Sequence, residues 1–232
     1  MEEGESKHPF NVLLGKYIPE ILVIFIGISI SFFFDEWRDN RKDDEIVEKH
    51  LTVLRESLVK DTLNLTVKIN HGDKLIRGIN KLTYSKLDSQ LTDSINLYID
   101  YAASYLVFKS NQMAYEEIRQ TAHTSLIKND SLKTAFLSYY TSVVPYSTEW
   151  SKVDETHTMT QLIPEMSTYF PVVPDSLNVI SSQEKVKKLK IRKLRNLLLA
   201  NATYKKETVQ AFIITKKAAV NLLKRVDDEL KK

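Results

Sequence analysis

Residues 17–42 read YIPEILVIFIGISISFFFDEWRDNRK and contain an apolar run at 21–34. Three small residues interrupt that run: Gly27, Ser29 and Ser31. Counted from Ile18, about 17 residues rise roughly 26 Å as a helix, near the lower limit for crossing a hydrocarbon core of about 30 Å. A core helix would not be apolar on all sides, and a signal peptide would have a basic start and a small-residue cleavage site. We therefore predict a retained transmembrane helix at residues 17–37.

Aromatic residues mark both ends of the predicted span. Tyr17 precedes the apolar run, and Trp37 follows it among charged neighbours. Tyr and Trp are enriched where a membrane meets water, because their rings are apolar and carry a polar atom. We expect Tyr17 and Trp37 to be interfacial anchors, with the lipid bilayer as the immediate partner.

One face of this helix combines small and polar residues. At 100° per residue, Glu20, Gly27 and Ser31 fall within about 40° of one another. Gly27 and Ser31 have the small-xxx-small spacing that lets two helices approach closely in lipid. The stripe predicts a homo-oligomer, or contact with other membrane proteins. Two alternatives remain: Glu20 simply lies among the headgroups, or the stripe lines the axis of a channel.

Beyond the span, the pattern is typical of a helical bundle. Between residues 39 and 82, apolar residues recur with heptad-like spacing, interrupted by Asp61. Residues 91–108 form a second amphipathic segment, and Asn129 is placed to cap a helix that Pro145 ends or kinks. Only five glycines occur, which favours long helices over hairpins. The predicted class is all-α, with the transmembrane helix continuing into a soluble antiparallel bundle.

The domain organisation follows from these segments. Ranges are assigned in chain order: an N-terminal tail at 1–16, the transmembrane helix at 17–37, a helical domain at 38–163, a proline-containing connector at 164–182, and basic C-terminal helices completing the bundle at 183–232.

The C-terminal part is strongly basic. Residues 183–232 hold 15 Lys and Arg against 5 Asp and Glu, although the whole chain has a formal net charge of only +3. Seven basic residues lie close together: Lys185, Lys187, Lys188, Lys190, Arg192, Lys193 and Arg195. They could contact anionic lipid headgroups. The plainer interpretation is a solvated basic face of a bundle helix, which could lie against the acidic residues between 43 and 48. No nucleic acid is expected, because the basic stretch lacks aromatic residues for base stacking.

The sequence offers no recognisable catalytic chemistry. There is no cysteine, no phosphate-binding glycine loop and no nucleophile motif. The five histidines lack the i, i+4 spacing of a helical metal site, so a metal centre would require distant residues to converge through folding. We predict a protein that is not an enzyme, with no catalytic residues, no cofactor and no metal.

The first 145 residues resemble a bacterial family of single-pass inner-membrane proteins that carry a helical domain of unknown function. Six positions match its opening motif: Tyr17, Glu20, Gly27, Trp37, Asn40 and Arg41. The later stretches LTVLRESLVKD and YEEIRQTAHTSLIKNDSLKTAFLSYY are similar to that family's later segments. The resemblance implies an inner-membrane protein with its C-terminal domain in the periplasm. The acidic start MEEGESK departs from the more basic N-termini of that family.

Two functional hypotheses follow. The first is a membrane-anchored, non-enzymatic protein that acts by homo-oligomerisation or protein interaction. The second is a homo-oligomeric channel or transport-accessory subunit, in which Glu20, Gly27 and Ser31 line a polar axis.

Overall fold

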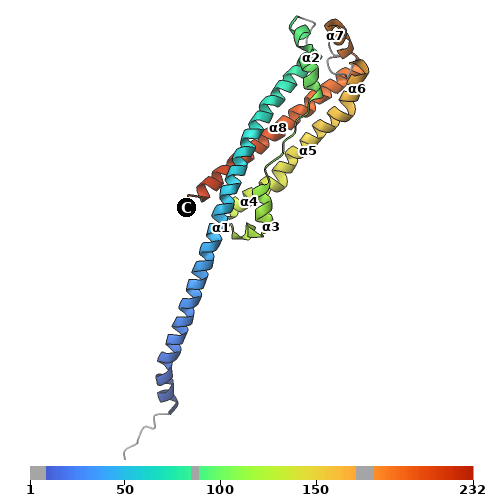
Figure 1. Ribbon diagram of the computed structural model, residues 1–232. Coiled ribbons are helices and arrows are strands. Elements are labelled where there is room, and N and C mark those ends of the chain that lie inside the picture. Colours follow the sequence, from blue (N-terminus) through green and yellow to red (C-terminus); the bar gives the residue numbers. More distant parts are fainter. Residues whose placement is uncertain (1–8, 85–88, 171–179, 232) are drawn as a thin grey trace, which may run out of the picture. The chain divides into compact units, whose positions relative to one another are not determined.

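The computed structural model describes residues 9–84, 89–170 and 180–231, and within these ranges the chain is helical, with no β-strand. The all-α prediction is therefore confirmed. The chain divides into two compact units, residues 1–49 and residues 50–232. The helices, shown in Figure 1, are α1 (Pro9–Tyr84), α2 (Ser89–Ala103), α3 (Met113–Gln120), the 3₁₀-helix η1 (His123–Leu126), α4 (Asp130–Ser138), the π-helix η2 (Tyr139–Val143), α5 (Val144–His157), the π-helix η3 (Thr158–Leu162), α6 (Ile163–Tyr169), α7 (Ser182–Leu189) and α8 (Arg192–Glu229).

The described part of the first unit is the N-terminal portion of α1. Residues 17–37 are helical, as expected, and the large apolar side chains between residues 21 and 34 are 46% to 70% exposed. In the part of the chain that the structure describes, no helix is long and apolar enough to cross a membrane, which does not support the transmembrane span predicted at residues 17–37.

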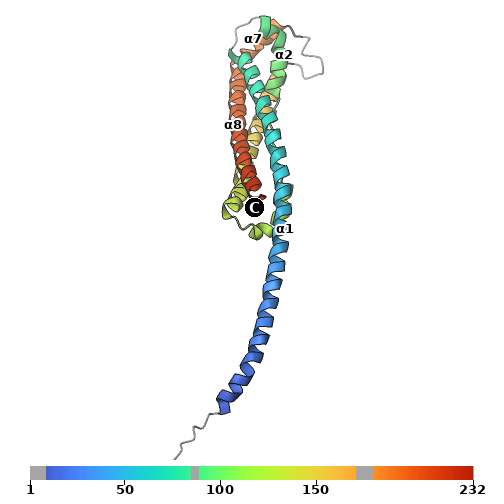
Figure 2. The ribbon, with the colours of Figure 1, turned by 90° about the vertical axis from the view of Figure 1, so that its left-hand side faces the viewer.

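In the second unit, α8 runs antiparallel to α1. Near one end, Arg55 Nε donates to Asp227 Oδ1 at 2.6 Å, and near the other, Arg195 Nε donates to the carbonyl of Thr83 at 3.4 Å. Along the same direction of the bundle, residue numbers therefore rise in α1 and fall in α8. Figures 1 and 2 show the two helices side by side in both views.

The helices α4 to α6 also run antiparallel to α8. Arg225 bonds to Ser131 at one end, and His157 lies 3.1 Å from the carbonyl of Leu197 toward the other. In the chain, α2 and α3 lie between α1 and α4. Together these helices form the antiparallel bundle that the sequence predicts.

A long non-helical segment lies between α2 and α3. The sequence predicts helix through residue 108, but α2 ends at Ala103, and we name residues 104–112 the connecting segment. Leu106 and Phe108 from this segment are each 1% exposed and pack with Leu65 and Phe212 in the core. The segment is therefore part of the bundle interior, and its buried backbone needs hydrogen-bond partners other than a helix.

Two prolines lie inside the continuous helical run from α4 to α6. Pro145 and Pro164 each occupy the second residue after a π-helical turn. Proline lacks an N–H and its ring crowds the carbonyl four residues earlier, and a wider i to i+5 turn accommodates both effects. Pro145 therefore does not end the helix. The connector predicted at 164–182 begins later, because α6 extends to Tyr169; its residues 171–179 lie outside the described part.

The core follows the apolar spacing of α1. Leu51, Leu54, Leu58 and Leu65 are at most 2% exposed, as their heptad-like spacing predicts. A second cluster near the opposite end of the bundle joins side chains of α1, α2, η3, α6, α7 and α8: Ile79, Leu82, Ile95, Ile99, Ala102, Leu162, Met166, Phe170, Val186, Leu189, Leu194, Leu198 and Ala202.

Candidate functional site

The small residues of the N-terminal helix lie in a shallow surface groove. The side chains and backbone that line it are Ile24, Gly27, Ile28, Ser31, Phe32 and Asp35. Ser31 Oγ donates to the carbonyl of Gly27 at 3.0 Å, so its hydroxyl is bonded within the helix. A Cβ atom placed on Gly27 would meet nothing within 4 Å. The predicted small-residue face is therefore open to a neighbour, although the groove extends to Asp35 and not to Glu20.

The residues flanking the apolar run are exposed. Tyr17 is 47% exposed, Trp37 is 53% exposed, and Glu20 is also on the surface. The Arg41 guanidinium lies over the Trp37 ring, 5.5 Å from its centroid, as in a cation–π contact. These positions are compatible with interfacial roles and do not test them.

Most of the predicted basic surface has partners inside the bundle. Lys188 Nζ lies 3.1 Å from Glu184, Lys193 Nζ lies 2.5 Å from Glu165, and Arg195 donates to the backbone as described above. Exposed ion pairs of this kind contribute little stability, but they reduce the charge available to a ligand. The side chains of Lys187, Lys190 and Arg192 are exposed.

Lys185 does not belong to this surface. Its side chain is 2% exposed, and its amino group donates to Asn96 Oδ1 at 2.7 Å. Burial lowers the pKa of Lys185, because a charged amine is less stable away from water. The proposal of a lipid contact is therefore wrong for this residue.

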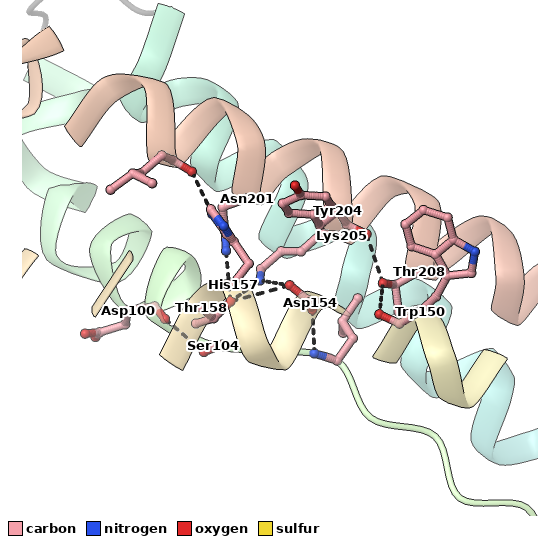
Figure 3. A network of polar contacts seen from close by, with 12 residues as sticks. Asp100, Ser104, Trp150, Asp154, His157, Thr158, Asn201, Tyr204, Lys205 and Thr208 are labelled. Atoms are coloured by element: carbon pink, nitrogen blue, oxygen red, sulfur yellow. Dashed lines mark hydrogen bonds and ion pairs between the residues drawn. The ribbon is translucent and has the colours of Figure 1, made fainter. Parts of the chain in front are cut away.

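The most completely buried charges form a network between α5, η3 and α8 (Figure 3). Lys205 and Asp154 have fully buried side chains, and Lys205 Nζ donates to Asp154 Oδ1 at 2.7 Å. The other carboxylate oxygen, Asp154 Oδ2, accepts from the backbone N–H of Leu106 at 2.8 Å. Asn201 Nδ2 donates to Thr158 Oγ1 at 2.9 Å, beside the ion pair. One carboxylate thus joins α8 to the connecting segment.

The ion pair determines the electrostatics of this network. Burial lowers the pKa of Lys205, and the neighbouring Asp154 carboxylate opposes that shift. Both groups are withdrawn from solvent and engaged with each other. No sequence pattern predicts this network, because Asp154 and Lys205 are 51 positions apart and belong to no motif.

A second buried carboxylate holds the other end of the connecting segment. Asp61, which interrupts the apolar stripe of α1, is 2% exposed. It accepts from Ser110 Oγ at 2.5 Å, from the backbone N–H of Asn111 at 2.8 Å and from Tyr139 Oη at 2.9 Å. Burial raises the pKa of Asp61, and these three hydrogen bonds oppose the shift. Burial beside this carboxylate also raises the pKa of Tyr139.

Two histidines that are distant in sequence meet at the surface of the bundle. His50 Nε2 on α1 lies 2.8 Å from His123 Nδ1 on η1, and the residues are 73 positions apart. His50 Nδ1 lies 3.8 Å from a carboxylate oxygen of Glu117. Among the described residues, no set of three or more His, Asp or Glu is arranged to hold a metal ion. Histidine spacing could not predict this pair, since only folding brings the two rings together.

A further groove crosses α5, η3 and α8. Its lining consists of Glu149, Lys152, Val153, Thr156, His157, Gln161 and Tyr204. The rings of His157 and Tyr204 lie 4.9 Å apart, and His157 is only 5% exposed. Because His157 also contacts the Leu197 carbonyl, its ring is fixed by the bundle. The groove has mixed charge and no converging set of reactive groups that would indicate a reaction.

Comparisons with protein-family models, curated proteins and solved structures found no match to this chain. The resemblance described from residues 17–42 therefore remains a prediction from the sequence.

Proposed function

We propose that this chain is a membrane-anchored, non-enzymatic helical protein that associates with copies of itself through the face containing Gly27 and Ser31. The observation that carries the proposal is the apolar run at 21–34, whose large side chains are 46% to 70% exposed. Soluble proteins rarely expose contiguous apolar surface of this extent without a partner.

Lipid is the partner best suited to this run. Eleven of its residues are Ile, Leu, Val or Phe. At roughly 0.3–0.6 kcal/mol each on an insertion scale, these side chains favour a membrane by about 3–7 kcal/mol. A carboxylate at the centre would cost roughly 2.5–3.5 kcal/mol, but Glu20 lies at one end of the run, where the cost is smaller. The favourable insertion free energy of the apolar side chains therefore exceeds the cost of placing the Glu20 carboxylate at the end of the run.

Length sets the second condition for an anchor. The 14 residues of the run rise about 21 Å, and adding residues 17–20 brings the helix to about 27 Å, against a hydrocarbon core of about 30 Å. Tyr17 begins that length, and Trp37 lies three residues beyond its end. We place the anchor at residues 17–37 in a bacterial inner membrane, with the C-terminal domain in the periplasm, on the basis of the family resemblance.

Self-association is supported by the chemistry of the Gly27 face. Gly27 has open space at its missing side chain, and the Ser31 hydroxyl is already bonded to the Gly27 carbonyl. A partner helix can therefore approach the backbone closely without leaving a polar group unsatisfied. The same hydrogen bond argues against a channel axis, because it occupies the hydroxyl proton that would otherwise face the pore.

The test is the oligomeric mass of the full chain in mild detergent. We expect the unmodified protein to exceed the monomer mass and Gly27→Leu to shift it toward the monomer, because the larger side chain prevents close approach. A Cβ atom at Gly27 meets nothing within 4 Å, and circular dichroism checks that Gly27→Leu stays folded, so that loss of association can be separated from misfolding. Ser29→Leu, on the opposite face, is the matched control and should retain the oligomer. A monomeric unmodified protein, both in detergent and after crosslinking in membranes, would refute self-association.

A further inference from the structure

The contact between His50 and His123 has the distances of a shared-proton hydrogen bond. The two nitrogens are 2.8 Å apart and the ring centroids are 5.1 Å apart. An imidazole nitrogen can hold a proton or direct a lone pair at a neighbour, so one proton lies between the two rings. Each ring therefore directs one nitrogen at a nitrogen of the other ring.

Glu117 completes an arrangement that is familiar from metal centres. Its carboxylate lies 3.8 Å from His50 Nδ1, on the side of the ring away from His123. A carboxylate in that position favours the tautomer with the proton on Nδ1, which leaves Nε2 with its lone pair. Metal-binding histidines commonly donate this N–H to a carboxylate. At 3.8 Å Glu117 is beyond hydrogen-bond distance from His50, so it acts on the ring through its charge.

We propose that His50 Nε2 and His123 Nδ1 bind a late first-row divalent metal ion, with Cu²⁺ held more tightly than Ni²⁺ or Zn²⁺. With metal–nitrogen bonds of about 2.0–2.1 Å, two adjacent ligands are about 2.9 Å apart at a right angle and about 3.4 Å apart in a tetrahedron. The observed separation of 2.8 Å is that of a hydrogen bond, so only a small movement brings the two nitrogens to either spacing. The preference for Cu²⁺ follows from the general order of divalent-metal affinities.

The turn that carries His123 can make the adjustment that metal binding requires. Metal binding needs the two lone pairs to converge on one point, so the His123 ring must rotate out of line with His50. None of the residues of η1 is buried, which leaves the turn lightly held. His50, by contrast, is 6% exposed on α1 and provides a fixed ligand.

The backbone before His123 turns sharply. Ala122 has φ = 57°, the left-handed conformation that commonly follows the last residue of a helix, and it lies directly after Thr121 at the end of α3. The conformation of Ala122 starts η1 and sets the position of His123 opposite His50. Since no third protein group of metal-ligand type converges on the pair within the described residues, water would complete the coordination shell.

Coordination requires one proton to move. The proton between the rings moves to the outer nitrogen of His123 or to solvent before both inner nitrogens can coordinate the metal ion.

The experiment titrates Cu²⁺ into the full chain, purified in detergent without a polyhistidine tag, and follows binding by calorimetry and electron paramagnetic resonance. We expect one Cu²⁺ per chain, hyperfine splitting from two nitrogens, and weaker binding of Ni²⁺ and Zn²⁺. His123→Gln should weaken Cu²⁺ binding at least tenfold, and Glu117→Gln should weaken it less, because Glu117 acts on His50 only through its charge. His71→Gln, on the exposed face of α1, is the matched control and should bind as the unmodified chain does.

His123→Gln is the decisive variant for the metal site. His123 is only partly buried, so replacing its side chain should leave the bundle folded. Circular dichroism checks that point independently of metal binding. If the unmodified chain binds no Cu²⁺ at pH 7.5, or if a folded His123→Gln variant binds it with unchanged affinity and two-nitrogen splitting, the proposed site does not exist.

Discussion

Two buried carboxylates, Asp61 and Asp154, decide how the connecting segment crosses the bundle. Each accepts a backbone N–H that has no helical partner, from Asn111 and Leu106 respectively. An unsatisfied buried N–H would cost about 1–3 kcal/mol, so the two residues stabilise a non-helical path through an otherwise helical core. Their burial is a structural requirement of that path.

Replacing Lys205 tests the contribution of its buried ion pair with Asp154. Replacing it with Met leaves the Asp154 carboxylate buried without its counter-charge, and breaking one side of a buried ion pair costs about 3–5 kcal/mol. We expect Lys205→Met to lower the free energy of unfolding by that amount, measured by urea denaturation in detergent. Lys152→Met, at an exposed position paired with Glu155, should change it by less than about 0.5 kcal/mol. Equal stability of the two variants would contradict the network described for Asp154.

Asp61 predicts a pH dependence with a definite sign. Its folded pKa is raised above the ordinary value of 3.8, so between 3.8 and the folded pKa the native state binds more protons than the unfolded state. The stability that Asp61 contributes is therefore greatest at low pH, and it declines as the pH rises through the folded pKa of Asp61.

The comparison is between the unmodified chain and Asp61→Asn, which cannot ionise. We expect the stability of the unmodified chain, relative to Asp61→Asn, to fall between pH 4 and pH 7. Urea denaturation at several pH values measures this difference. A difference that stays constant or grows with rising pH would show that the Asp61 pKa is not raised.

At the scale of elements, apolar spacing predicts α1 well and the connecting segment poorly. Leu51, Leu54 and Leu58 are buried as their period requires, because the burial of a helix face depends on local spacing. Residues 104–108 continue an apolar pattern that resembles helix. The acceptors that hold the connecting segment, Asp154 for Leu106 and Asp61 for Asn111, lie about fifty positions away. Local sequence carries no signal for such long-range hydrogen bonds.

The conformation at the prolines is also not predicted by local sequence. Pro145 is a sound signal for an interrupted helix, but the sequence does not distinguish a break from a π-helical turn. The neighbouring contacts decide between them: Thr215 Oγ1 lies 3.5 Å from the carbonyl of Val143, just before the proline, and α8 packs along this run. Tertiary packing thus keeps the helix continuous where local preference would stop it.

Gly72 tests how closely α1 and α8 pack. A Cβ atom at Gly72 would lie 2.4 Å from Val209 Cγ2 and 2.9 Å from Leu106 Cδ1. Overpacking costs typically about 1–3 kcal/mol, partly offset by up to about 1 kcal/mol of helix propensity gained on replacing glycine by alanine.

We expect Gly72→Ala to lower the thermal midpoint of the bundle, measured by circular dichroism. Gly27→Ala, where the new Cβ meets nothing within 4 Å, should leave the midpoint unchanged. A midpoint for Gly72→Ala at or above that of Gly27→Ala would show that the close approach of Val209 is readily relieved.

At the scale of the whole molecule, the two units differ in what surrounds their apolar residues. The second unit, residues 50–232, has its own core of buried Leu, Ile, Phe and Val side chains. The apolar run of the first unit lies on an exposed helix. Composition and periodicity identified both features, whereas the contacts of His50, Asp61 and Asp154 required the folded chain.

Membrane partition shows whether residues 17–37 hold the protein in a membrane. Cells producing the full chain are lysed without detergent, and the membranes are separated and washed with alkaline carbonate, which removes peripheral proteins. We predict that the full chain stays in the washed membranes, because the exposed apolar run at 21–34 favours lipid over water. Recovery of the folded full chain in the aqueous fraction, without detergent, would contradict the account.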